Sequence, residues 1–176
     1  GSEHRYAFYP YSGGQSMWVD IPAEALTLSY DDSSWLLGTA PYGISDSSCP
    51  VPVVSEWARS DEIIVVRVSF YLPPERYGVY VDTRHHEFLE LAIDGEPCTW
   101  HNHWPACPYV EESYGPWYDI SPGANHVLVA ASVTDGSGDP GLYLHQHLDI
   151  RIRADLTTAV PDDRSTTWST IKALYR

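Results

Sequence analysis

The sequence predicts an all-β fold, an antiparallel β-sandwich, and three observations lead to this prediction. Short runs of β-branched and aromatic residues recur along the chain, with clusters of Gly, Pro, Asp and Ser between them. Helical periodicity is nearly absent until the C-terminal end. Apolar residues make up 43% of the chain, which is enough for a substantial core. We therefore expect one sandwich domain over residues 1–153.

The clearest predicted strand covers Glu62–Leu72. Side chains alternate between the two faces of a strand, so every second residue shares a face. Pro73-Pro74 ends the strand, because proline cannot donate a hydrogen bond to the ladder. One face of this strand is wholly apolar and consists of Ile64, Val66, Val68, Phe70 and Leu72.

Further strands are predicted along the chain, and turn residues separate them. Asp94-Gly95 is a typical pair for a two-residue hairpin turn. The last strand alternates between apolar residues and a polar face that carries His145, His147 and Asp149, which is typical of a half-buried strand. The predicted strands are Tyr77–Val81, Phe88–Ile93, Val127–Val133 and Leu142–Ile152.

Residues 154–176 have a different character and are predicted to form a linker and a C-terminal tail. Asp155–Thr167 is polar and reads as a linker. Trp168, Ile171 and Leu174 recur at three-residue spacing, which predicts a short helix over Ser169–Arg176. Because a free helix of this length is marginal in water, the tail must dock on the body, dock on a partner or stay disordered.

Charge and missing motifs exclude several classes of function. The net charge is −14 and Lys172 is the one lysine, so phosphate backbones and anionic membrane surfaces are repelled. No apolar run is long enough for a membrane helix. The sequence contains no GxSxG elbow, HExxH pair, phosphate loop or dinucleotide fingerprint. We therefore expect a protein that is not an enzyme and that binds neither nucleic acid nor a membrane.

The segment Tyr30–Trp35 (YDDSSW), with Gly38–Gly43 (GTAPYG), resembles a recurrent stretch of the galactose-binding-like jelly-roll modules of bacterial secreted proteins. Later pieces resemble the same modules in the same order; they are Arg67–Pro73, Leu89–Glu96, Asn125–Ala130 and Leu148–Ile152. The resemblance implies a jelly-roll sandwich, a secreted or extracellular location, and a binding role such as carbohydrate binding or adhesion. Asp and Ser side chains stabilise turns, so Asp31 and Asp32 are interpreted as a corner and not as catalytic carboxylates.

The segment Cys98–Trp117 departs from these modules because it is longer and more aromatic, and it is predicted to be an extended loop. Sugar recognition needs flat aromatic faces and a few fixed polar groups, both of which this segment supplies. A subunit contact and plain packing over the sandwich remain open as alternatives. The predicted ligand-binding residues are Trp100, His101, Asn102, His103, Trp104, Tyr109, Tyr114 and Trp117, with Glu111 and Glu112 as further polar groups.

The three cysteines leave the disulfide pairing open. Cys98 and Cys107 bracket the aromatic segment, and a disulfide between them would close it in an oxidising compartment. Cys49 would then be the odd thiol. A bridge from Cys49 to either of the others is the main alternative.

The sequence contains candidate residues for two kinds of metal site. His145 and His147 project from one face of a predicted strand and suit zinc or another transition metal, although a solvent-facing strand has the same pattern. Galactose-binding-like modules often carry a structural calcium, so the resemblance implies that loop residues such as Asp46, Asp135 and Asp139 are possible calcium ligands.

The sequence thus favours a non-catalytic extracellular module that binds a glycan. The alternative is a structural subunit of a self-assembling extracellular protein or filament, and so a homo-oligomer. Seven Trp and 13 Tyr suit a buried interface as well as a sugar site. The stretch Tyr6–Tyr9 can add a strand to a neighbour if it is exposed.

Overall fold

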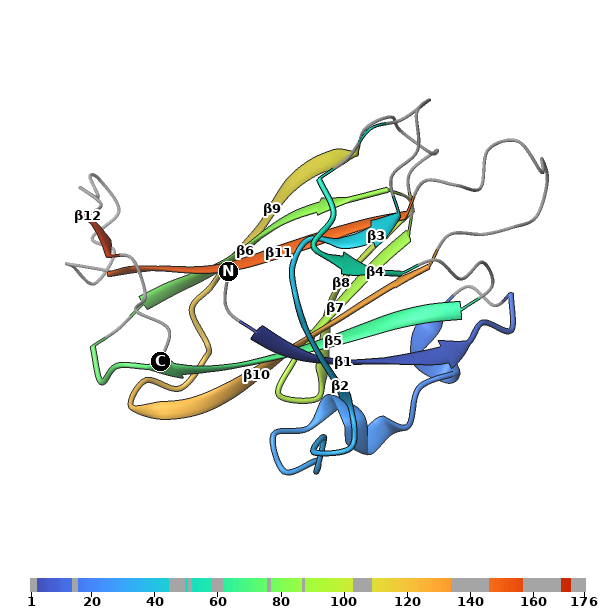
Figure 1. The fold of residues 1–176 in the computed structure, drawn as a ribbon. Coiled ribbons are helices and arrows are strands. Elements are labelled where there is room, and N and C mark those ends of the chain that lie inside the picture. The colour runs from blue at the N-terminus through green and yellow to red at the C-terminus, as the bar shows by residue number, and fades with distance from the viewer. Residues whose placement is uncertain are drawn as a thin grey trace.

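The computed structural model describes residues 3–13, 16–44, 50, 52–57, 62–75, 77–86, 88–102, 109–133, 146–156 and 169–171. These residues form two β-sheets packed face to face, with two single-turn 3-10 helices, η1 (Met17–Val19) and η2 (Ala23–Leu26). The predicted all-β sandwich is confirmed. Figure 1 shows the two layers, with the helical turns on the outer side of one of them.

The first sheet, sheet A, contains six strands in the order β2-β1-β5-β10-β7-β8. All of its neighbouring strands are antiparallel. The central pair, β5 and β10, matches Leu72 with Ala124 at one end and Ile64 with Ser132 at the other. The strands are β1 (Glu3–Pro10), β2 (Leu36–Thr39), β5 (Glu62–Leu72), β7 (Phe88–Ile93), β8 (Glu96–Asn102) and β10 (Ala124–Val133).

The second sheet, sheet B, has the order β4-β3-β11-β6-β9, with β12 paired to β11 off this path. Its pairs are antiparallel except for the parallel pair β3 and β4. The strands are β3 (Tyr42–Ile44), β4 (Ser55–Glu56), β6 (Tyr77–His85), β9 (Val110–Trp117), β11 (Gln146–Leu156) and β12 (Ser169–Ile171).

Several predicted strands have the expected positions. Strands β5 and β7 have the predicted bounds, and β10 includes the predicted Val127–Val133. The Asp94-Gly95 turn is confirmed, because both residues have positive φ, 52° and 93°, as a type I′ hairpin requires. This turn leads directly into β8, so the prediction of one long loop over Cys98–Trp117 is wrong. Strands β8 and β9 form most of that segment, and residues 103–108 between them lie outside the described part of the chain.

Two further predictions about the ends of the chain are corrected. Ser169–Ile171 is a strand, β12, and not part of a helix. Strand β3 pairs with β11 only at Gln146–Leu148, which leaves the same edge of β11 open at Ala154–Leu156, where β12 pairs. At the other end, Tyr6–Tyr9 is not an edge that awaits a neighbour, because β1 lies between β2 and β5.

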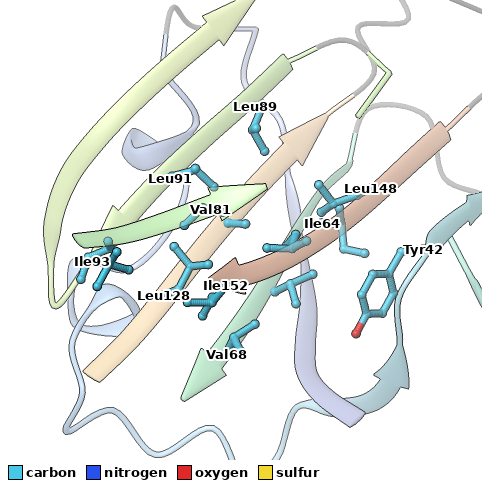
Figure 2. Packing of buried hydrophobic residues seen from close by; sticks show 14 of the residues in the cluster. Tyr42, Ile64, Val68, Val81, Leu89, Leu91, Ile93, Leu128, Leu148 and Ile152 are labelled. Carbon is cyan, nitrogen blue, oxygen red and sulfur yellow. The ribbon is translucent and has the colours of Figure 1, made fainter. Parts of the chain in front are cut away.

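The inner faces of the two sheets form the main hydrophobic core. Strand β5 contributes the predicted apolar face, and β11 contributes Leu148, Ile150 and Ile152. Figure 2 shows Leu148 and Ile152 of sheet B among side chains of sheet A, which include Ile64, Leu89, Leu91 and Leu128. The alternation recognised in the sequence therefore identifies the face that packs between the sheets.

A second hydrophobic cluster lies on the outer face of sheet A. Ile63 and Val65 point away from the main core and pack with Val127, Val129 and Ala131 of β10. The chain between β1 and β2 covers them through Met17, Ile21, Ala25, Leu26 and Trp35. The centre of sheet A, at β5 and β10, is therefore buried on both faces.

We refer to the chain between β1 and β2 as the cover of sheet A. The corner at Asp31–Trp35 holds this cover in place. Asp31 Oδ1 accepts a hydrogen bond of 3.0 Å from the Ser33 backbone N–H, which confirms the predicted turn and lowers the pKa of Asp31. Asp32 forms a 2.9 Å ion pair with the buried guanidinium of Arg67 on β5. Arg67 also donates to the carbonyl oxygens of Ala25 and Thr27. A buried charge is stable only when it is paired in this way.

Cys98 is a free thiol, so the predicted bridge to Cys107 is not formed. On β8 its side chain turns toward the main core, where Sγ donates a 3.3 Å hydrogen bond to the Leu91 carbonyl oxygen. Burial raises the pKa of Cys98 to about 11. Cys49 and Cys107 lie outside the described residues.

Candidate functional site

The outer face of sheet B is polar and carries a candidate site. Strand β6 is central, and its outward residues are Tyr80, Asp82 and Arg84. Strand β11 places Arg153, Arg151 and Asp149 opposite these three residues in turn. On the other side, β9 places Ser113 opposite Asp82 and Glu111 opposite Arg84. Acidic and basic side chains thus alternate across the three strands.

A groove of about 380 Å³ lies over this part of the sheet. A volume of this size fits a small ligand. The residues that line it are Asp82, Thr83, Arg84, Glu111, Glu112, Ser113, Asp149 and Arg151. We refer to this feature as the sheet B groove.

Ion pairs and hydrogen bonds hold the groove side chains in place. The Arg84 guanidinium lies 2.7 Å from the Glu111 carboxylate, and Arg151 lies 3.3 Å from Asp149. Asp82 accepts a 2.6 Å hydrogen bond from the Ser113 hydroxyl. Just beyond the groove, Arg153 bridges Asp82 and Asp155, at 3.3 Å and 2.6 Å. These contacts fix the orientations of the polar groups before any ligand binds.

Aromatic rings lie at both ends of this polar face. At one end, the Arg84 guanidinium carbon is 5.4 Å from the centre of the Tyr109 ring. At the other end, the Arg153 guanidinium carbon is 4.2 Å from the centre of the Tyr80 ring. Both distances are within the range of cation–π contacts. The polar face therefore carries aromatic rings next to the charged residues that line the groove.

His147 is buried beside the same end of the groove as Tyr109. Its side chain is 1% exposed, and the Tyr109 ring stacks on it at 4.9 Å between centres. Within the described part of the chain, neither ring nitrogen has a hydrogen-bond partner. Burial lowers the pKa of His147 to about 4, so the ring is neutral at neutral pH.

The predicted ligand-binding residues fall into four groups. Tyr109 lies beside the groove, where its ring contacts Arg84 and stacks on His147. Tyr114 and Trp117 are partly buried and pack against the main core. The Tyr114 hydroxyl also donates to Glu112, whose carboxylate lies 3.2 Å from His85 Nε2. The backbone of Trp100, His101 and Asn102 forms the end of β8, while His103 and Trp104 lie outside the described residues.

The metal predictions stay untested. No group of three or more His, Cys, Asp or Glu side chains among the described residues is placed to hold a metal ion. His145, the partner proposed for His147, lies outside these residues, as do Asp46, Asp135 and Asp139. Among the same described residues, no helix is long and apolar enough to cross a membrane.

The sequence did not single out Asp82, Arg84, Ser113 or Arg151 as site residues. Each lies on a strand at an alternate position, which is the ordinary place for a polar residue on a half-exposed sheet. The alternation of inward and outward residues within Tyr77–His85 and Gln146–Leu156 is a sequence signal that points to this face. Their meeting depends on the pairing of β11, β6 and β9, and this register is not visible in the sequence.

Comparisons with known proteins support the fold. No family model matches the chain, and no curated protein is similar to it in sequence. Among solved structures, 86% of the chain matches 18% of a β-glucuronidase from glycoside hydrolase family 2, with 11% identity and a TM-score of 0.51. A β-glucuronidase from Faecalibacterium prausnitzii matches over 80% of this chain and 25% of its own, with 10% identity and a TM-score of 0.48.

A third similar structure is a PA14 sugar-binding domain from an RTX adhesin. It covers 95% of this chain and 94% of its own, with 10% identity and a TM-score of 0.37. The chain thus spans less than a quarter of the first β-glucuronidase, and identities this low concern the fold alone. The fold and the groove together define a β-sandwich domain with a polar, ligand-sized groove on one sheet.

Proposed function

We propose that this chain is a non-catalytic carbohydrate-binding or adhesion module of the galactose-binding-like kind, secreted and extracellular, that binds a glycan in the sheet B groove. The observation that carries the proposal is the groove itself, in which carboxylates and guanidinium groups alternate at fixed positions. Sugar hydroxyls both donate and accept hydrogen bonds, so they need both kinds of partner close together. Carboxylates accept and guanidinium groups donate.

Preorganisation of the groove side chains supports binding without chemistry. Arg84, Asp82 and Arg151 are already held by neighbouring side chains, so a ligand does not have to order them. Less entropy is then lost on binding. Catalysis would need polarised or perturbed groups aimed at a reacting atom. In the groove, Arg84 and Arg151 instead lie in surface ion pairs with Glu111 and Asp149.

The aromatic segment before β9 extends the proposed site. Tyr109 lies beside the groove, and the chain reaches it from Trp100, His101, Asn102, His103 and Trp104. We propose that these residues add flat aromatic faces and polar groups at the Tyr109 end of the groove. Tyr114 and Trp117 have a different role in the proposal, because packing against the main core uses their rings.

A glycan array followed by an NMR titration of an array hit tests the proposal. The side chain of Arg151 is 68% exposed, so Arg151→Ala should fold normally and still lose affinity, by about tenfold, if one charged hydrogen bond to the sugar is lost. Tyr109→Ala should also weaken binding. Tyr71→Ala is the matched control, because Tyr71 is an exposed tyrosine on sheet A. A blank array, or full affinity in Arg151→Ala, would contradict the proposal.

A second candidate function is assembly into a larger extracellular structure. It is favoured by the edge strand β2, which pairs with β1 on one side and exposes Leu36 and Leu37. Exposed apolar edges are templates for pairing with another chain. Light scattering distinguishes the two functions. Particles of many subunits that dissociate in Leu36→Lys, together with a blank glycan array, would favour assembly, whereas a monomer that binds glycan would exclude it.

A further inference from the structure

The charges in the sheet B groove bear on which sugars it favours. We propose that the groove binds amino and neutral sugars more tightly than sugars that carry a negative charge, such as uronic acids. This inference rests on the proposed function, since it specifies the class of glycan. Three features of the groove support it: the number of charged groups, their pairing and the neutrality of the neighbouring histidine.

Carboxylates outnumber guanidinium groups in the groove. The lining contains Asp82, Glu111, Glu112 and Asp149 against Arg84 and Arg151. Arg153, next along β11, is balanced by Asp155 and therefore leaves the excess unchanged. The chain as a whole carries a net charge of −14, which adds a long-range repulsion of anions.

Each guanidinium on this face already has a carboxylate partner. Arg84 pairs with Glu111 at 2.7 Å, and Arg153 pairs with Asp82 and Asp155. Arg151 lies 3.3 Å from Asp149. A uronate would have to separate one of these pairs and then lie next to the displaced carboxylate. A ligand hydroxyl can accept from an arginine N–H and donate to a carboxylate while leaving the pair together.

The neighbouring histidine adds no positive charge. His147 is buried beneath Tyr109, and the charged or titratable groups that act on it are Asp149, Arg84 and His85. Its pKa is lowered to about 4, so the imidazole is neutral at neutral pH. A neutral imidazole carries no charge that would attract a carboxylate.

The test compares sugars that share a ring and differ in charge. The probes are galactose, galactosamine and galacturonate, with glucose, glucosamine and glucuronate as a second series. Each is titrated by NMR against the intact chain at neutral pH and low salt. We expect affinity to fall from the amino sugar through the neutral sugar to the uronate, with each charge step on the order of threefold. Added salt should reduce the differences.

Glu111→Gln tests whether the groove sets this preference. The Glu111 side chain is 61% exposed, so the variant should fold. It removes the partner of Arg84, and the ratio of uronate to neutral-sugar affinity should rise by about threefold. Glu96→Gln, at an exposed glutamate of sheet A, is the matched control and should leave the ratio unchanged.

The outcomes separate this inference from the function on which it rests. Uronates that bind the native chain as well as the neutral sugars would overturn the inference and leave glycan binding intact. An unchanged ratio in Glu111→Gln would overturn it too, because the selectivity would then lie elsewhere. If none of the six sugars binds and the glycan array is blank, the proposed function fails, and the inference fails with it.

Discussion

The outer faces of the two sheets are built from the same kind of strand, but one face is covered by the chain and the other is open. On sheet A, the chain between β1 and β2 covers the outer face, and Ile63, Val65 and Val129 are fully buried there. On sheet B, the corresponding face of β6, β9 and β11 is polar and holds the groove. Period-two alternation alone does not tell which face meets solvent, because a covering segment can bury both.

The charged residues on the two faces differ in the same way. Arg67 on sheet A is buried and fully partnered by Asp32 and two backbone carbonyls. Arg151 on sheet B is exposed and lies 3.3 Å from Asp149. The first arginine is a structural anchor for the cover, whereas the second is available to a ligand. Four predictions test this contrast, and they are given in order of decreasing effect.

The largest effect is expected from Arg67→Ala. The change leaves Asp32 and the carbonyls of Ala25 and Thr27 without their partner in a buried site, so the free energy of unfolding should fall by about 3–5 kcal/mol. Arg151→Ala should lower it by less than about 0.5 kcal/mol, because its side chain is mostly exposed. Urea unfolding curves measure both values. Equal losses in the two variants would show that the faces do not differ.

The next effect is a loss of stability in acid that depends on His147. The unfolded ring titrates near its ordinary pKa of 6.5 and the folded ring near 4, so the unfolded state binds more protons between these values. The free energy of unfolding should therefore fall as the pH drops from 6.5 to 4, by about 3 kcal/mol in total. His147→Phe should remove this part of the pH dependence. Parallel stability curves for the two proteins would contradict the assignment.

A smaller effect is expected from Glu90→Ala on the outer face of sheet A. The Glu90 carboxylate is buried and accepts hydrogen bonds from the Met17 N–H, at 2.9 Å, and the Ser16 hydroxyl, at 3.2 Å. Its loss leaves these donors under the cover unsatisfied and should cost about 1–3 kcal/mol in thermal or urea unfolding. Glu96→Ala, at an exposed position, should be near neutral. A neutral Glu90→Ala would mean that the cover does not depend on this contact.

The smallest effect is expected from the Arg84 and Glu111 pair on sheet B. Both side chains are partly exposed, so a double-mutant cycle with Arg84→Ala and Glu111→Ala should give a coupling energy below about 1 kcal/mol. Added salt should reduce it further. A coupling of several kcal/mol would show that the groove is as tightly built as the Arg67 site, and would argue for a structural role.

Much of the fold could be predicted because local rules were enough. The bounds of β5 and β7, the Asp94-Gly95 turn and the corner at Asp31 depend on neighbouring residues, through alternation, proline, positive φ and short side-chain hydrogen bonds. The errors arose where a distant partner decided the outcome. Ser169–Ile171 became a strand because β11 has an open edge, and Cys98 is free because β8 turns its side chain toward the main core.

The sequence predicted what kind of residues the candidate site contains, but only part of where the site lies. The aromatic segment led to Tyr109, which lies beside the groove. Arg84, Asp82 and Arg151 were missed, because each is an ordinary polar residue on its own strand. They become a site only when antiparallel register brings them side by side. Register is set by long-range pairing, which no local pattern records.

The sequence by itself determined an acidic, aromatic-rich β-sandwich, because alternation and turn chemistry act between residues that are close along the chain. The tertiary structure alone decided which sheet face is covered and which is open. It buried Ile63 and Val65 beneath a segment that precedes them in the chain, and it aligned three strands to form the groove. Burial and charge pairing depend on which surfaces meet in space, and sequence neighbours do not determine that.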